Sequence, residues 1–192
     1  MSPKARSEEA ILRAALDLMA EHGVGGLTVD AVAARAGVGK QTIYRHWGSR
    51  ARLVHDAIAC TNDPLVEPDT GSLRGDLEAL VSQLARFLSN PDTGRVFPSM
   101  LEAAERDPEL AELRQAHAAK KRDAFRRVLA RAAERGEVDA ELDVEAAVDL
   151  VVGPIFYRRL VARTQVGDDV VGHHLDLALR AMAPRQETVA VH

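Results

Sequence analysis

The sequence has few of the residues that stabilise small secreted proteins or build membrane spans. Cys60 is the single cysteine among 192 residues, so no disulfide bond can form within the chain. The densest apolar run, LVVGPIFY at 150–157, is far shorter than the ~20 residues that a membrane span needs. Glu8 and Glu9 occupy the place where the apolar segment of a signal peptide would begin. We therefore expect a cytoplasmic protein that does not contact a membrane.

Aromatic residues are also scarce, at 4% of the chain, and no stretch shows the alternation of apolar and polar residues that is typical of strands. Alanine and arginine are abundant instead, and alanine-rich stretches favour helix. The apolar fraction of 46% is ordinary for a globular protein and is enough for a packed core. These features predict an all-α fold.

The net charge of −4 is unevenly distributed along the chain. Residues 1–60 contain eight Lys and Arg against six Asp and Glu, so this part has a net charge of +2. Residues 61–192 contain the remaining seventeen basic and twenty-three acidic residues and have a net charge of −6. The basic N-terminal part is the better candidate for contact with nucleic acid.

The N-terminal part shows four short helical segments with recognisable ends. Thr28 and Ser49 are good N-cap residues, and Gly37 suits the left-handed position that ends a helix. Gly39 is a weak N-cap for the short segment KQTIYRHW, so a helix–turn–helix is predicted around GVG at 37–39. The expected helices are 7–22, 29–36, 40–47 and 50–61.

Residues 62–72 contain two prolines and a glycine and predict a linker, which divides the chain into domains 1–60 and 61–192. Longer helical patterns follow at 73–89, 95–106, 109–135, 143–164 and 168–183. The pattern at 143–164 is apolar on nearly every side, so this helix must be buried all round. One small domain cannot easily bury it alone, which suggests a subunit interface.

The stretch GLTVDAVAARAGVGKQTIYRHWGSRARLV at 26–54 contains the elements Leu-Thr-Val, Val-Ala, Ala-Gly-Val, Thr-Ile-Tyr and His-aromatic in that order. It resembles the DNA-binding domain of the TetR (tetracycline repressor) family in both elements and spacing. The C-terminal part resembles the regulatory domains of that family in architecture, and LVVGPIFYRRLV is similar to one actinobacterial-type branch. Two departures are Gly39, where the family often has Ser, and Arg50–Ala51, where it often has Lys-Glu.

The resemblance implies an N-terminal three-helix domain with a helix–turn–helix, and a larger helical C-terminal domain for ligand binding and dimerisation. It also implies a sequence-specific transcriptional regulator, a repressor in the typical case, that is not an enzyme and needs no cofactor. Such a protein binds a palindromic double-stranded DNA operator as a homodimer, and a small hydrophobic effector releases it.

The segment 40–47 is the expected recognition helix, which lies in the major groove with its N-terminal residues at base edges. Lys and Arg donate hydrogen bonds to guanine and Gln pairs with adenine, so we expect Lys40, Gln41 and Arg45 to contact bases. The resemblance supports Lys40 and Gln41 more strongly. For Arg45, a solvated cation or a phosphate contact is an equal alternative.

Five further residues are expected to contact DNA phosphates, which positions the protein without reading sequence. They carry hydroxyl, imidazole or guanidinium donors, and two of them open helices, where backbone N–H groups favour an anion. For Tyr44 and His46 a partly buried packing role is the alternative, and Ile43 and Trp47 are expected in the core. The five residues are Thr28, Thr42, Tyr44, His46 and Arg50.

The C-terminal helices supply two further sets of candidates. Apolar side chains at Phe87, Phe97, Met100, Leu101, Phe125, Phe156 and Tyr157 can line an effector pocket, with simple core packing as the alternative for each. The expected dimer interface, in the last two helices, comprises Val151, Phe156, Val171, Leu175, Ala178 and Met182. The resemblance implies the same location.

Other classes of function have weaker support in the sequence. His173 and His174 are adjacent and face different ways, and Asp176 completes only a pair with His173, so no metal site is expected. No Gly-rich phosphate loop, Ser/His/Asp grouping or carboxylate pair is evident. Two alternatives remain open: a DNA-binding architectural dimer without a pocket, and an enzyme whose site lies in the helical C-terminal domain.

Overall fold

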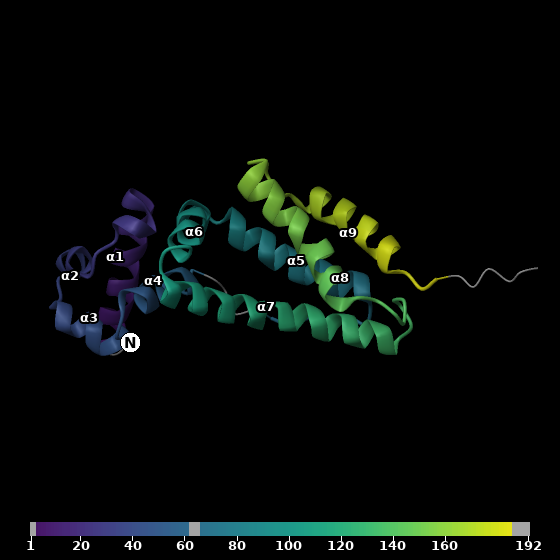
Figure 1. The fold of residues 1–192 in the computed structure, drawn as a ribbon, viewed down its shortest axis with the longest axis horizontal. Helices are drawn as coiled ribbons and strands as arrows, with labels where there is room; N and C mark the ends of the chain where they lie inside the picture. The colour runs from purple at the N-terminus through teal and green to yellow at the C-terminus, as the bar shows by residue number, and fades with distance from the viewer. Residues whose placement is uncertain (1–2, 62–65, 186–192) are drawn as a thin grey trace, which may run out of the picture. The chain divides into compact units, whose positions relative to one another are not determined.

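A computed structural model describes residues 3–61 and 66–185, with side chains described from Arg6 onward. The described residues form helices and no strands, which confirms the predicted all-α fold (Figure 1). None of the described helices combines the length and the apolar character that a membrane crossing requires. The elements are α1 (Pro3–Gly26), α2 (Val29–Ala36), α3 (Lys40–Trp47), α4 (Arg50–Ala59), α5 (Leu73–Ser89), α6 (Pro91–Ala104), α7 (Pro108–Glu134), α8 (Val144–Phe156), η1 (Tyr157–Val161) and α9 (Asp168–Met182).

The chain packs as two compact units. The first unit contains the residues up to 64 together with 87–119, and the second contains 65–86 together with 120–192. Both α5 and α7 contribute residues to the two units. Packing therefore groups 87–119 with the N-terminal helices, whereas the sequence division places them in the domain 61–192. That division into functional domains stays a prediction.

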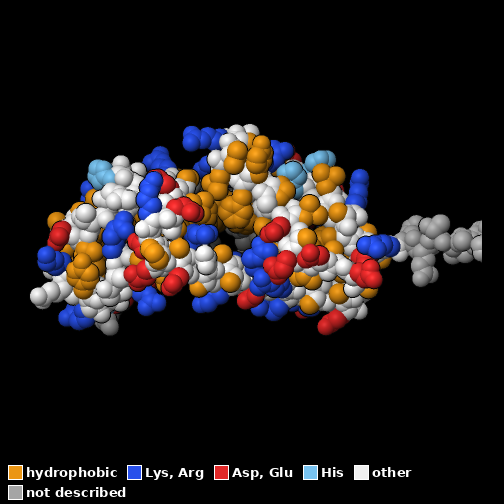
Figure 2. Space-filling view, viewed as in Figure 1, with side chains coloured by type: hydrophobic (Ala, Val, Ile, Leu, Met, Phe, Trp, Pro, Cys, Tyr) orange, Lys and Arg blue, Asp and Glu red, His pale blue; other side chains and the backbone are white. Residues whose placement is uncertain are grey.

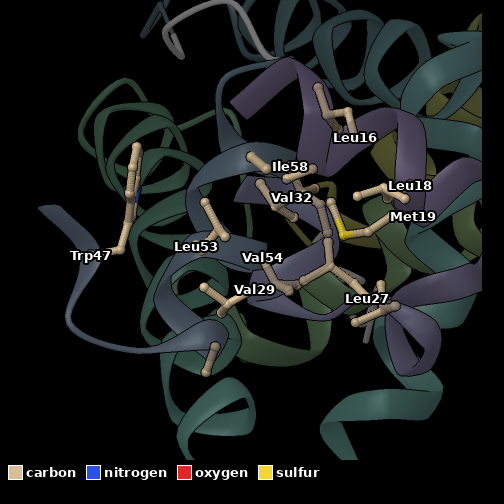
Figure 3. Packing of buried hydrophobic residues seen from close by; sticks show 14 of the residues in the cluster. Leu16, Leu18, Met19, Leu27, Val29, Val32, Trp47, Leu53, Val54 and Ile58 are labelled. Carbon is tan, nitrogen blue, oxygen red and sulfur yellow. The ribbon is translucent and has the colours of Figure 1, made fainter. Parts of the chain in front are cut away.

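In the first unit, α1 packs against α2, α4 and α6, and α3 packs against α2 and α4. The buried side chains form one hydrophobic cluster that includes Ile43 and Trp47 of α3. Figure 3 shows side chains of α1, α2 and α4 pointing toward one another in this cluster, among them Met19, Val32 and Val54. Apolar burial of this kind is the main force that holds short helices in place, because an isolated eight-residue helix is unstable in water.

The ends of the short helices follow local sequence signals. The Thr28 Oγ1 accepts a hydrogen bond from the Ala31 N–H at 3.2 Å, and the Ser49 Oγ accepts one from the Arg52 N–H at 3.1 Å. Gly37 has φ 66° and ψ 33°, the left-handed conformation that ends α2. Gly39 offers no side-chain cap to α3. These four positions agree with the predictions.

Three helix boundaries differ from the expected ones. Helix α6 begins at Pro91 and not near residue 95, because the Asn90 side chain accepts hydrogen bonds from Asp92 N and Thr93 N and Pro91 occupies the first helical position. The expected helix 143–164 is α8 followed by the π-helical η1, which ends at Val161. Helix α1 begins before Ser7, and Gly23, at φ 71°, interrupts it before its end at Gly26.

The second unit is built around α8 and α9, which pack against each other. The buried residues are Ala147, Val148, Val151 and Ile155 on α8 and Val171, Leu175, Ala178 and Met182 on α9. Arginines of α7 are paired with acids of this unit: Arg122 and Arg126 with Glu145, and Arg131 with Glu67. The hydrogen bonds from Arg126 and Arg122 lower the pKa of Glu145 to about 2.

Candidate nucleic-acid interface

The recognition helix α3 has one buried side and one exposed side. Ile43 is 1% exposed and Trp47 is also buried, as predicted, so these two side chains fix the helix to the core beneath it. The exposed residues of the outer side are Lys40, Gln41, Tyr44 and Arg45. A short helix with a polar outer side and an apolar inner side can enter a groove without uncovering the core.

All three predicted base-contacting residues are exposed. The Lys40 Nζ lies 3.4 Å from the Asp30 Oδ1, and both side chains are well exposed to solvent. An exposed ion pair of this kind contributes little to stability, so Lys40 can exchange it for a DNA acceptor at low cost. The pairing of Asp30 with Lys40 depends on how α2 and α3 pack, so the sequence alone does not indicate it.

The hydroxyl-bearing residues of the predicted phosphate set are accessible to different degrees. Thr28 is exposed at the N-terminus of α2, and its hydroxyl hydrogen stays available because the cap uses only the oxygen lone pairs. Tyr44 is 50% exposed and Thr42 is half-buried. Thr28, at the start of α2, and Thr42 and Tyr44, on α3, can each donate a hydrogen bond to a phosphate oxygen.

His46 has a partner within the chain. Its Nδ1 lies 3.0 Å from the Glu8 Oε1, its side chain is largely buried, and its ring lies 5.6 Å from the Trp47 ring. This geometry fits the alternative in which His46 is partly a packing residue between α1 and α3. Its phosphate contact stays a prediction.

Arg50 also has partners within the chain. Its Nε donates to the Leu27 carbonyl at 2.8 Å, one terminal nitrogen donates to the Val24 carbonyl, and the other lies 3.5 Å from the Asp107 Oδ2. The guanidinium therefore faces acceptors of α1, the α1–α2 turn and the start of α7. The predicted phosphate contact of Arg50 is untested, and it competes with these bonds.

The predicted pocket residues do not come together within one unit. Phe87, Phe97, Met100 and Leu101 belong to the first unit, and the remaining three belong to the second. The rings of Phe87 and Phe97 meet edge to face at 5.6 Å, and Met100 is buried in the first core. In the second unit Phe125 is buried, Phe156 is half-buried and Tyr157 is exposed. The pocket stays a prediction.

Most of the predicted dimer-interface residues are buried within the single chain. Helices α8 and α9 pack against each other within one chain, and five of the six residues are at most 2% exposed there: Val151, Val171, Leu175, Ala178 and Met182. Within one chain these side chains offer little surface to a partner, and the interface predicted at them stays untested. Helical periodicity finds an apolar stripe but does not say which neighbour covers it.

A different apolar surface remains exposed on the same helices, and Figure 2 shows hydrophobic side chains at the surface of this region. Leu150 on α8 is 44% exposed, and Tyr157 on η1 is 61% exposed. Val161 and Leu177 are exposed as well. We call Leu150, Tyr157, Val161 and Leu177 the outer apolar face. They lie on α8, η1 and α9, and exposed large apolar residues are candidates for a protein interface.

His174 and Asp176 of α9 have partners within the second unit. The Arg158 Nε lies 3.1 Å from the His174 Nε2, and Arg74 is paired with Asp176. Burial, followed by the positive charges of Arg158 and His173, lowers the pKa of His174. The interaction with Arg158 requires the neutral imidazole, since the accepting nitrogen must have a free lone pair.

The comparisons with known proteins agree with this geometry. Residues 11–57 match the family model described as bacterial regulatory proteins, tetR family, and residues 67–178 match the model described as Tetracyclin repressor-like, C-terminal domain. The uncharacterised HTH-type transcriptional regulator YdeS of Bacillus subtilis is 38% identical, over 96% of this chain and 92% of its own.

Two further relatives extend the comparison. The DNA-binding transcriptional repressor TetR of Mycobacteroides abscessus is 32% identical, over 87% of this chain and 88% of its own. The crystal structure of the TetR-family regulator SCO0332 is 30% identical, with a TM-score of 0.68 over 93% of this chain and 99% of that chain. With a helix–turn–helix in the matched N-terminal segment and a matched regulatory domain after it, this chain belongs to the TetR family of DNA-binding transcriptional regulators.

Proposed function

We propose that this regulator is a repressor that binds a palindromic operator as a homodimer and that a small hydrophobic ligand releases it. The observation that carries the DNA-binding part is the two-sided α3, which has Ile43 and Trp47 buried beneath an exposed polar surface. The 32% identical relative from Mycobacteroides abscessus is named a repressor, which supports repression over activation.

On this proposal, Lys40, Gln41 and Arg45 contact base edges in the major groove, because all three are exposed on α3. Thr28, Thr42 and Tyr44 donate hydrogen bonds to phosphates on either side of the groove. The contacts to bases supply sequence preference, and the contacts to phosphates supply affinity and register.

The test of DNA binding starts from a random pool of duplexes, from which the full-length protein selects its preferred sequence. Binding to the selected duplex is then compared with binding to a scrambled duplex of the same composition, across a salt series. A specific regulator prefers its own site by roughly 10³-fold or more. Equal binding to both duplexes would refute sequence-specific recognition and would favour the architectural alternative.

The homodimer is proposed to form through the outer apolar face, which the intrachain packing of α8 and α9 leaves exposed. A twofold dimer places two recognition helices in successive major grooves about 34 Å apart or a multiple of that distance. The selected duplex should therefore contain two inverted half-sites. A selected sequence with a single asymmetric site would contradict the dimeric mode of binding.

The proposed effector acts through the helical C-terminal part, since that part matches the Tetracyclin repressor-like C-terminal model. A set of hydrophobic compounds can be screened for those that raise the melting temperature of the protein, because a ligand that binds only the folded state stabilises it. Each hit is then added to the complex with the selected duplex. Affinity for DNA should fall about 5- to 150-fold. Hits that bind without changing DNA affinity would count against ligand-induced release.

A further inference from the structure

The start of α4 is joined to three other parts of the first unit by hydrogen bonds and an ion pair. Arg50 is the first residue of α4, and its guanidinium bonds the carbonyls of Val24 and Leu27. Val24 lies in the last turn of α1, where carbonyl groups have no partner within the helix. Leu27 directly precedes the N-cap of α2, Thr28. Arg50 thus bonds one carbonyl in the last turn of α1 and one in the α1–α2 turn, and the Val24 carbonyl also accepts from the Leu27 N–H at 3.3 Å.

The third partner of Arg50 lies at the start of α7. Asp107 precedes this helix, and its Oδ1 accepts a hydrogen bond from the Leu110 N–H at 3.2 Å while its Oδ2 lies 3.5 Å from the Arg50 guanidinium. Next to this pair, the Ser49 Oγ donates to the Glu109 Oε1 at 2.6 Å. The N-terminus of α4 is therefore held to the N-terminus of α7 by two neighbouring contacts.

A further contact reaches the same turn from α6. The Ser99 Oγ accepts a hydrogen bond from the Val24 N–H at 3.2 Å and donates to the Val96 carbonyl at 2.9 Å. The Val24 carbonyl thus accepts a hydrogen bond from Arg50, and the Val24 N–H donates one to Ser99. The α1–α2 turn, which carries the phosphate-facing Thr28, is fixed between α4 and α6.

The recognition helix is linked directly to this arrangement. Only Gly48, at φ 72°, and the N-cap Ser49 separate the end of α3 from Arg50. A connection this short leaves α3 little freedom, so its direction follows the placement of the start of α4. The side chains that fix that start also fix where Lys40 and Gln41 lie relative to Thr28.

We propose that Arg50 is a positioning residue, which holds the α1–α2 turn, the start of α4 and the start of α7 together and so sets the placement of α3 for DNA binding. This inference rests on the proposed DNA-binding function and replaces a direct contact between Arg50 and a phosphate. The side chains of Arg50 and Asp107 are each 31% exposed, so the pair is partly shielded from solvent. A guanidinium suits the role because its planar fork donates in several fixed directions at once.

The two roles of Arg50 predict opposite results for Asp107→Asn. If Arg50 binds a phosphate, loss of the Asp107 charge frees the guanidinium and removes a repulsive charge, so DNA affinity rises. If Arg50 positions α3, the same change weakens the ion pair and affinity falls. Asparagine keeps a side-chain oxygen for the cap of α7, so the variant perturbs the pair more than the helix.

The experiment measures the binding of the full-length variants Arg50→Gln, Arg50→Lys, Asp107→Asn and Arg50→Gln/Asp107→Asn to the selected and scrambled duplexes across a salt series. The matched control is Arg52→Gln, which removes an exposed positive charge from the same helix. If the fraction of molecules with α3 correctly placed falls to a tenth, affinity for the selected duplex falls about tenfold. We expect that loss for each of the three single variants at Arg50 and Asp107, and little further loss in the double variant.

The slope of log affinity against log salt separates positioning from phosphate binding. A lost phosphate contact reduces this slope by about 0.9, and we expect Arg50→Gln to leave it unchanged. Circular dichroism at the assay temperature checks that each variant is folded. If Arg50→Gln does not fold, Asp107→Asn still decides between the two roles. Higher affinity of Asp107→Asn, a reduced slope for Arg50→Gln, or full affinity of Arg50→Lys would overturn the proposal. Failure of the wild type to prefer its selected duplex would instead refute the proposed function.

Discussion

Replacement of Ile43 by alanine separates the two sides of the recognition helix. Ile43 is 1% exposed and lies in the hydrophobic cluster of the first unit, so its truncation removes three methyl or methylene groups from a packed core. Large-to-small changes of this kind cost about 2–5 kcal/mol. In a chain of this length each kcal/mol lowers the melting temperature by roughly 2–4 °C, so we expect a decrease of about 4–20 °C.

The matched control is Tyr44→Ala, one residue further along the same helix. Tyr44 is 50% exposed, so this change should alter the free energy of unfolding by no more than about 0.5 kcal/mol while it weakens binding to every duplex. Thermal unfolding followed by circular dichroism gives the stability, and titration with the selected and scrambled duplexes gives the affinity. If Ile43→Ala melts within about 1 °C of the wild type, or Tyr44→Ala is the less stable of the two, the assignment of inner and outer sides is wrong.

Further predictions concern the bases, the dimer and the response to pH. Lys40→Ala and Gln41→Ala should each reduce discrimination between selected and scrambled duplex by about 1–3 kcal/mol, and an equal loss on both duplexes would argue against base contact. The double variant Leu150→Glu/Tyr157→Glu should sediment as a monomer, because charges buried at an interface cost several kcal/mol. Its helix content should not change, because both side chains are exposed within one chain. A stable dimer would place the interface elsewhere. His174 has a pKa below its ordinary value of 6.5, so the unfolded chain binds a proton at a higher pH than the folded chain does. The stability that the neutral imidazole contributes is therefore present above pH 6.5 and is lost as the pH falls toward the lowered pKa. His174→Gln should flatten the decrease in the free energy of unfolding between pH 7 and pH 5, measured by denaturant titration, and an unchanged decrease would assign it to other groups.

The features that could be predicted from the sequence are those that local interactions decide. Thr28, Gly37 and Ser49 mark helix ends because a cap depends on the residue itself and on N–H or carbonyl groups at most a few positions away. Ile43 and Trp47 could be assigned to the core because they recur four residues apart on an otherwise polar helix. The helix–turn–helix, which consists of such local signals, follows from them.

Other features depend on contacts between distant residues. Arg50 and Asp107 are 57 positions apart, and neither residue type nor spacing indicates that they pair. The same holds for His46 and Glu8, which meet only after α1 and α3 have packed. A cation at the start of a helix is equally suited to a phosphate and to an internal acceptor, so the sequence alone could not decide between the two for Arg50.

The apolar residues of α8 show what a sequence pattern leaves open about an interface. The sequence shows that this helix is apolar on nearly every side, and within one chain Leu150 stays exposed while Val151 is buried. The sequence pattern does not say which of these apolar side chains another helix of the same chain covers. If one side of this helix were polar, the sequence would have indicated a single apolar side as the one to be buried. The exposed fraction of each side chain distinguishes them, and Leu150 and Tyr157 are therefore the residues that we propose a second copy of the chain covers.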